Sequence, residues 1–208
     1  MELSISLLNA KDKFSTIKKL NYTKINYFHI DVMDGKFVSQ VSVTPLEIKE
    51  ISSISKKPLD IHLMVEDPIT YIEEIKELTN INNITFHLEI DKDINSILER
   101  LKEYGIKRGI SINPTTDINL LKPYLDNIDI ILVMSVEPGY GGQPFIESST
   151  QRLKNIAKLI ENYNILLEVD GGINDKTIRK VSSSDIAVVG SYITTSNDME
   201  ERINKLIV

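Results

Sequence analysis

The stretch YFHIDVMDG, residues 27–35, begins as an apolar, β-prone segment but carries two polar side chains inside it. His29 and Asp31 are two residues apart, and such residues point to the same side of a strand. Burying both groups costs free energy unless each one finds a partner. The stretch therefore indicates a buried strand that presents a histidine and a carboxylate on one face, with their partners elsewhere in the chain.

Seven further runs rich in β-branched residues resemble this stretch. With it, they give expected strands at residues 3–8, 25–32, 58–65, 82–89, 107–113, 128–136, 165–170 and 185–190. Segments between them carry apolar residues at helical spacing, as in the set Ile94, Ile97, Leu98 and Leu101. Asp67, followed by proline, predicts the start of one helix, and Ser196 predicts the N-cap of the last.

Strands that alternate with helices predict a parallel sheet. Eight such units in 208 residues fit a closed (β/α)8 TIM barrel, a single domain over residues 1–208, because no linker rich in Pro, Gly or Ser divides them. The alternative is an open doubly wound sheet, which usually has a glycine fingerprint after its first strand. Residues 7–14, LLNAKDKF, contain no glycine, and this favours the barrel.

Composition excludes several classes of protein. The chain has no cysteine, and so it has neither a disulfide framework nor a thiolate zinc site. Its net charge is −6 with both signs scattered, which argues against a nucleic-acid partner. No apolar run approaches the roughly 20 residues of a membrane span. The start, MELSISLLNAKDKF, is too short and polar for a signal peptide, and a cytoplasmic protein is expected.

Barrel enzymes carry their chemistry where the strands end. All three histidines, His29, His62 and His87, lie late in expected strands, and Asp170 ends the seventh. His29, Asp31, His62 and Asp170 can therefore converge at the barrel mouth. Two imidazoles and two carboxylates suit one divalent transition-metal ion per subunit, such as Zn, Fe, Co or Mn. His87 is expected to be a hydrogen-bonded core residue instead.

Eight segments, in order along the chain, carry a family resemblance. They are ISLL (5–8), FHIDVMDGKFV (28–38), DIHLMV (60–65), FHLE (86–89), INPTT (112–116), VMSVEPGYGGQPF (133–145), EVDGG (168–172) and VVGS (188–191). Together they resemble the signature segments of the ribulose-phosphate 3-epimerase family. The resemblance implies a (β/α)8 barrel, a homo-oligomer, and a metal-dependent conversion of D-ribulose 5-phosphate to D-xylulose 5-phosphate, a step of the pentose phosphate pathway.

The resemblance also implies roles for individual residues. Asp31 and Asp170 match the two acid/base groups, one removing the proton on carbon 3 and the other delivering a proton to the opposite face. The metal would stabilise the enediolate that forms between these steps. Met33, Met64 and Met134 match side chains that shield this enediolate from water.

A second set of residues is expected to bind the substrate. Glycine lets backbone N–H groups approach phosphate oxygens closely, and barrels often bind phosphate with the loops after strands seven and eight. The expected substrate-binding residues are Ser6, His62, Gly141, Gly142, Gly171, Gly172, Gly190 and Ser191. Ser6 is included because the resemblance matches it to the substrate-contacting serine of the family. His87 and Glu89 match a family segment without an assigned role.

Some positions depart from the family pattern. Lys36 stands where the family usually has histidine, Ser39 and Gln40 replace Pro-Asn, and Tyr140 replaces phenylalanine. All lie in loops that could close over substrate, so they bear on substrate length and affinity.

Three alternatives remain open. D-allulose-6-phosphate 3-epimerase shares the metal and both aspartates. A non-catalytic sugar-phosphate binder would not need two opposed carboxylates. A phosphosugar decarboxylase or synthase is disfavoured because HIDVMDG stands where such enzymes typically have Asp-x-Lys-x-x-Asp.

Overall fold

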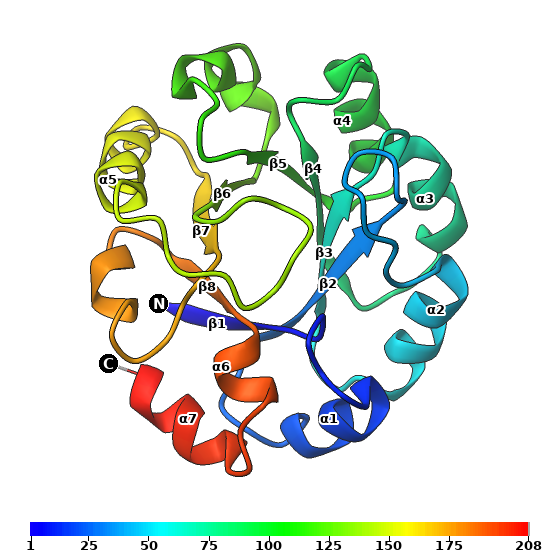
Figure 1. The fold of residues 1–208 in the computed structure, drawn as a ribbon. Coiled ribbons are helices and arrows are strands. Elements are labelled where there is room, and N and C mark those ends of the chain that lie inside the picture. The colour runs from blue at the N-terminus through cyan, green and yellow to red at the C-terminus, as the bar shows by residue number, and fades with distance from the viewer. Residues whose placement is uncertain (208) are drawn as a thin grey trace.

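The computed structural model describes residues 1–207 and has a closed barrel of eight parallel strands. The strands occupy the centre of Figure 1, and the helices form a ring around them. They are β1 (Glu2–Ser6), β2 (Tyr27–Met33), β3 (Leu59–Met64), β4 (Ile81–His87), β5 (Lys107–Ile112), β6 (Ile130–Met134), β7 (Leu166–Asp170) and β8 (Ile186–Val189). Strands pair in chain order and β1 pairs with β8, which confirms the predicted TIM barrel.

The connections between strands are mostly α-helical. The helices are α1 (Lys13–Leu20), α2 (Pro45–Ile54), α3 (Pro68–Ile75), α4 (Ile94–Glu103), α5 (Ser149–Leu159), α6 (Ser191–Thr194) and α7 (Met199–Leu206). After β5 and β7 the chain forms 3₁₀ helices instead, η1 (Ile118–Asn127) and η2 (Ile178–Val181). Pro123 lies inside η1 and has no N–H to donate to an α-helical turn.

The predicted helix starts have different outcomes. Asp67 is the N-cap of α3, although its carboxylate accepts a hydrogen bond from the Thr70 hydroxyl at 3.0 Å rather than from the helix backbone. The prediction that Ser196 caps the last helix is wrong. Asp198 caps α7 and accepts from the backbone N–H of Glu201 at 2.9 Å. A carboxylate is favoured there because the helix N-terminus carries partial positive charge.

Alternation along β2 separates the core from the site. Phe28 and Ile30 belong to the large apolar cluster that includes residues of the surrounding helices. His29 and Asp31 fall on the other face, toward the barrel interior. Both are buried. The strand is thus buried on both faces, which explains why it reads as apolar with polar insertions.

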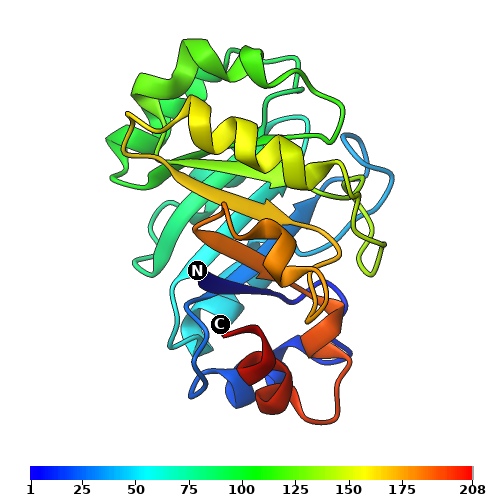
Figure 2. The ribbon, with the colours of Figure 1, turned by 90° about the vertical axis from the view of Figure 1, so that its left-hand side faces the viewer.

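Two loops project beyond the carboxyl ends of the strands. The loop after β6, residues 135–148, crosses the middle of the ring in Figure 1 and extends from the same end of the barrel as the loop after β2 in Figure 2. A hydrogen bond of 2.9 Å between the hydroxyls of Ser39 and Tyr140 joins them. Both residues are among the departures from the family pattern.

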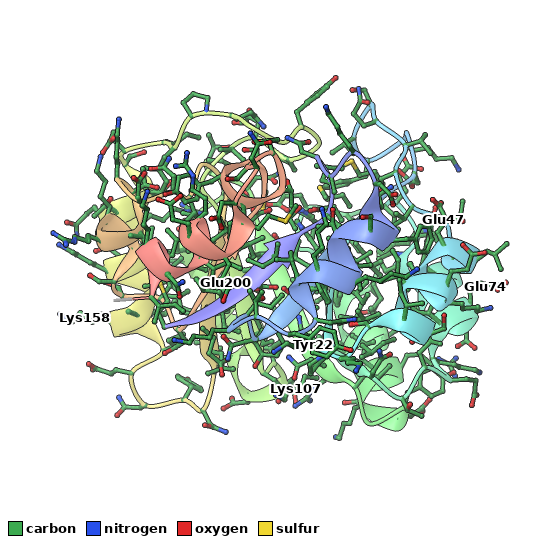
Figure 3. The ribbon with its side chains drawn as sticks, turned by 90° about the horizontal axis from the view of Figure 1, so that it is seen from below. Tyr22, Glu47, Glu74, Lys107, Lys158 and Glu200 are labelled. Carbon is green, nitrogen blue, oxygen red and sulfur yellow. The ribbon has the colours of Figure 1, made fainter. Side chains whose placement is uncertain are left out.

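Charged side chains of both signs cover the outside of the barrel. Glu74, Lys107, Lys158 and Glu200 are exposed, and Figure 3 shows them on the outer surface. None of the helices within residues 1–207 combines the length and the apolar character that crossing a membrane requires.

Candidate active site

A cavity of about 420 Å³ opens at the carboxyl ends of the strands. All but two of the predicted site residues line it. These are Ser6, Asp31, Met33, Met64, Met134, Gly141, Gly142, Asp170, Gly171, Gly172, Gly190 and Ser191. The two others, His29 and His62, are fully buried and lie against Asp31. Segments far apart in the sequence therefore meet at one site.

The four predicted metal ligands converge. His29, Asp31, His62 and Asp170 each offer a ligand atom, and these atoms all lie within 4.8 Å of one another. His29 Nε2 lies 3.4 Å and His62 Nδ1 3.5 Å from the same oxygen, Asp31 Oδ1. Neither nitrogen has a hydrogen-bond partner within residues 1–207. Because unpartnered buried polar atoms are costly, two such nitrogens facing carboxylates fit a transition-metal cation between them.

Asp60 fixes the orientation of His29. Its Oδ2 lies 2.6 Å from His29 Nδ1 and accepts a hydrogen bond from the Ser4 hydroxyl at 2.7 Å, and its Oδ1 accepts one from the Asn83 amide at 2.7 Å. An ionised carboxylate can only accept, so in the neutral ring that binds a cation His29 Nδ1 carries the proton and Nε2 has a free lone pair on the side of Asp31. Without a cation, burial opposes the charged ring, but the negative charges of Asp60 and Asp31 outweigh it and raise the pKa of His29 well above its usual range. The sequence analysis missed Asp60. Its signal was the spacing Asp60-x-His62, which is the His29-x-Asp31 pattern in reverse order.

Glu168 is a second buried carboxyl that the sequence analysis missed. It is fully buried, and it lies with His29 and Asp60 in a group whose ligand atoms are within 4.8 Å of one another. Burial raises the pKa of Glu168 well above its usual range, and the negative charge of Asp60 raises it further. These surroundings favour the neutral, protonated form of the Glu168 side chain.

The two proposed acid/base groups differ in their surroundings. Burial opposes ionisation of Asp31, but His29 and His62 outweigh it and hold its pKa well below the usual range. The Ser6 hydroxyl also donates to Asp31 at 2.7 Å. Burial, with the charge of Asp31, raises the pKa of Asp170 to about 7. Two carboxylates with pKa values pushed apart suit paired acid and base roles, and a cation between them would lower both values.

The glycines in the loops around the cavity let neighbouring chain segments pack closely against one another. A Cβ at Gly172, where φ is +65°, would lie 2.4 Å from the backbone nitrogen of Phe145. Only glycine fits there without displacing the backbone. Asn9 was missed by the sequence analysis, although it also lines the cavity and its amide lies 2.6 Å from where a Cβ of Gly141 would be.

The three methionines near the strand ends lie around the two aspartates. Met33, Met64 and Met134 are almost fully buried, and each contributes to the cavity wall. Their thioethers offer no acidic proton to the space between the carboxylates.

The chain was compared with families and proteins of known sequence. It matches the Ribulose-phosphate 3 epimerase family over residues 2–194. It is 36% identical to a ribulose-phosphate 3-epimerase of Helicobacter pylori J99, covering 99% of this chain and 96% of that protein. It is 31% identical to that of Bacillus subtilis 168, covering 91% and 89%.

Comparison with solved structures gives the fold. The 3-hexulose-6-phosphate synthase of Salmonella typhimurium superposes with a TM-score of 0.69 at 16% identity, covering 99% of this chain and 96% of that one. Identity this low shows the shared barrel alone. The family match and the sequence relatives, together with the converging site, show that the chain belongs to the ribulose-phosphate 3-epimerase family and is an isomerase.

Proposed function

We propose that the protein is a metal-dependent ribulose-phosphate 3-epimerase that interconverts D-ribulose 5-phosphate and D-xylulose 5-phosphate in the pentose phosphate pathway. The observation that carries this proposal is that Asp31 and Asp170 line one cavity beside two unpartnered histidine nitrogens. The names of the sequence relatives support the choice of substrate. Side-by-side turnover of D-ribulose 5-phosphate and D-allulose 6-phosphate tests it against the six-carbon alternative.

The positions of the two aspartates suit inversion at one carbon. Asp31 lies on β2 and Asp170 lies on β7, and β8 and β1 separate these two strands around the barrel. A substrate held in the cavity would expose opposite faces of carbon 3 to the two carboxylates. One takes the proton from the first face, and the other delivers a proton to the second. In the reverse direction their roles exchange.

The proposed cation site consists of His29, Asp31, His62 and Asp170. Zn, Fe, Co and Mn all suit two imidazoles and two carboxylates, and one ion per subunit is proposed. Such an ion would supply positive charge where negative charge develops on the substrate oxygens. Met33, Met64 and Met134 keep water away from the same space.

We infer that residues 1–208 form one domain, because β1 and β8, from opposite ends of the chain, pair in one barrel. The homo-oligomer and the cytoplasmic location stay predictions. Size-exclusion chromatography with light scattering tests the first of these.

Ser191 offers a test of phosphate binding. Its hydroxyl lies 3.9 Å from where a Cβ of Gly142 would be, so the two are neighbours in the cavity wall. A hydrogen bond to a charged group contributes about 1.5–3 kcal/mol, so Ser191→Ala should raise KM by about tenfold or more with little change in kcat. Ser148→Ala is the control, because Ser148 is exposed and makes no side-chain capping bond. Steady-state kinetics in which both variants match the parent would contradict the assignment.

Asp60 offers a test of ligand orientation. Asp60→Asn replaces the carboxylate that fixes the proton on His29 Nδ1 with a neutral amide, which accepts more weakly and whose NH2 group can donate to that nitrogen and reverse the tautomer. Changes of this kind typically cost about 10–100-fold in metal affinity, and that loss is expected here. Chelator competition with Zn²⁺ measures it. Asp129→Asn is the control, since Asp129 pairs with Arg108 at the other end of the barrel. Equal affinities in both variants would show that Asp60 does not orient the ligand.

A further inference from the structure

His87 and Glu89 have no role in the proposed proton transfer, yet they form a row of contacts that begins at His62. His87 is fully buried on β4, and its Nε2 lies 2.9 Å from His62 Nε2. The two rings stack with centroids 5.0 Å apart. On its other side, His87 Nδ1 lies 3.1 Å from Glu89 Oε2. Phe37 packs on the His87 ring at 4.6 Å between centroids. The row Glu89, His87, His62 therefore leads to the proposed cation site.

Glu89 is held as an ionised acceptor. Its Oε1 accepts from the backbone N–H of Asn113 at 2.8 Å and from the Thr116 hydroxyl. Burial would raise the pKa of Glu89, but these bonds and the one from His87 outweigh burial and lower it to about 2. The carboxylate therefore accepts hydrogen bonds and donates none at neutral pH.

The ionised Glu89 carboxylate determines which ring nitrogen carries the proton in His87 and then in His62. Because Glu89 only accepts, His87 carries its proton on Nδ1, and its Nε2 has a free lone pair. The short distance between the two Nε2 atoms then needs a proton on His62 Nε2. His62 Nδ1 is left with a lone pair, and this is the unpartnered atom that lies 3.5 Å from Asp31 Oδ1.

We propose that Glu89 and His87 are positioning residues that hold His62 in the tautomer able to bind a cation through Nδ1. The inference rests on the cation site of the proposed function. His29 and His62 are then oriented in parallel ways. Asp60 contacts His29 directly, whereas a carboxylate acts on His62 through a second histidine. Such partners fix the ring and its tautomer and strengthen metal binding.

The first experiment reads the tautomer in protein stripped of metal. Side-chain ¹⁵N–¹H NMR of the three histidines should show His62 protonated on Nε2 in the parent. In His87→Phe that proton loses its acceptor, and His62 should shift toward Nδ1–H, which can donate to Asp31. His87→Gln should keep the parent tautomer, because its amide oxygen can accept from His62. Protonation of the parent on Nδ1, or no shift in His87→Phe, would overturn the proposal.

The second experiment measures Zn²⁺ affinity by chelator competition. Glu89→Leu, which has no acceptor for His87, and His87→Phe should each weaken binding by about 10–100-fold, with partial recovery in His87→Gln. Glu66→Leu is the matched control, since Glu66 lines the same hollow as Glu89, whereas the carboxylate that contacts His87 Nδ1 is that of Glu89. Unchanged affinity in Glu89→Leu would overturn the proposal even if His87→Phe fails to fold. Failure of the parent to bind Zn²⁺ would refute the proposed cation site itself. The NMR measurement of the His62 tautomer would still test the hydrogen bonds among Glu89, His87 and His62.

Discussion

Asp31→Asn and Asp170→Asn are each expected to lose about 10²–10⁴-fold in kcat, the range that a positioned acid or base typically contributes. Asparagine matches aspartate in shape but takes up no proton, so the cavity keeps its form while one face of carbon 3 loses its acid/base group. Both residues line the cavity, and Asp31 also contacts His29 and His62. Steady-state turnover of D-ribulose 5-phosphate measures the effect.

The two variants also test whether one carboxylate can serve both faces. With one aspartate intact, a substrate epimer can still exchange its carbon 3 proton with solvent on that side, but it cannot be converted to the other epimer. Metal content and thermal unfolding serve as controls, because both residues are proposed ligands. Turnover close to that of the parent in either variant would contradict the two-aspartate mechanism.

Removing the divalent ion is expected to abolish turnover and to destabilise the fold. Two buried histidine nitrogens face carboxylates without a hydrogen-bond partner, so a bound cation satisfies groups that are otherwise costly to bury. A ligand at 100 times its Kd stabilises the folded state by about 2.7 kcal/mol. In a domain of this size that corresponds to a rise in Tm of roughly 5–10 °C. Differential scanning calorimetry of chelated and Zn²⁺-loaded protein measures it.

Ca²⁺ provides the control for this experiment. It prefers oxygen ligands, so a site with two imidazoles should bind it weakly and give little shift in Tm. Full turnover by protein from which metal analysis shows that the transition metals have been removed would refute metal dependence.

The barrel and most of the site could be predicted because they follow from periodic patterns. Alternating strands and helices gave the fold class, and the spacing of His29 and Asp31 placed both on one face of a strand. The convergence of His62 and Asp170 on that face followed from the barrel itself. Each of these inferences needs only the order of elements along the chain.

Asp60 and Glu168 were missed because alternation gives the face of a residue but not its depth in the barrel. Depth depends on the register between strands, which pairs His29 with Asp60 and Asp31 with His62. Asp60 therefore lies level with His29, deeper in the barrel than Asp31 and His62, where it can support His29. The partner of His87 was hidden for the same reason, since its contact with His62 crosses from β4 to β3.

The residue that caps the last helix also could not be predicted from the sequence alone. Ser196 and Asp198 are both good N-cap residues, and only the path of the chain into α7 decides between them. Ser196 instead accepts a hydrogen bond from the backbone N–H of Asp198, ahead of the helix.

The most direct test of the central claim is proton NMR of D-ribulose 5-phosphate in deuterated water with metal-loaded protein. The account predicts that D-xylulose 5-phosphate appears and that deuterium enters at carbon 3, because the proton delivered to the second face comes from an aspartate that exchanges with solvent. Absence of both exchange and epimer formation would contradict the assignment of this substrate to the Asp31 and Asp170 site.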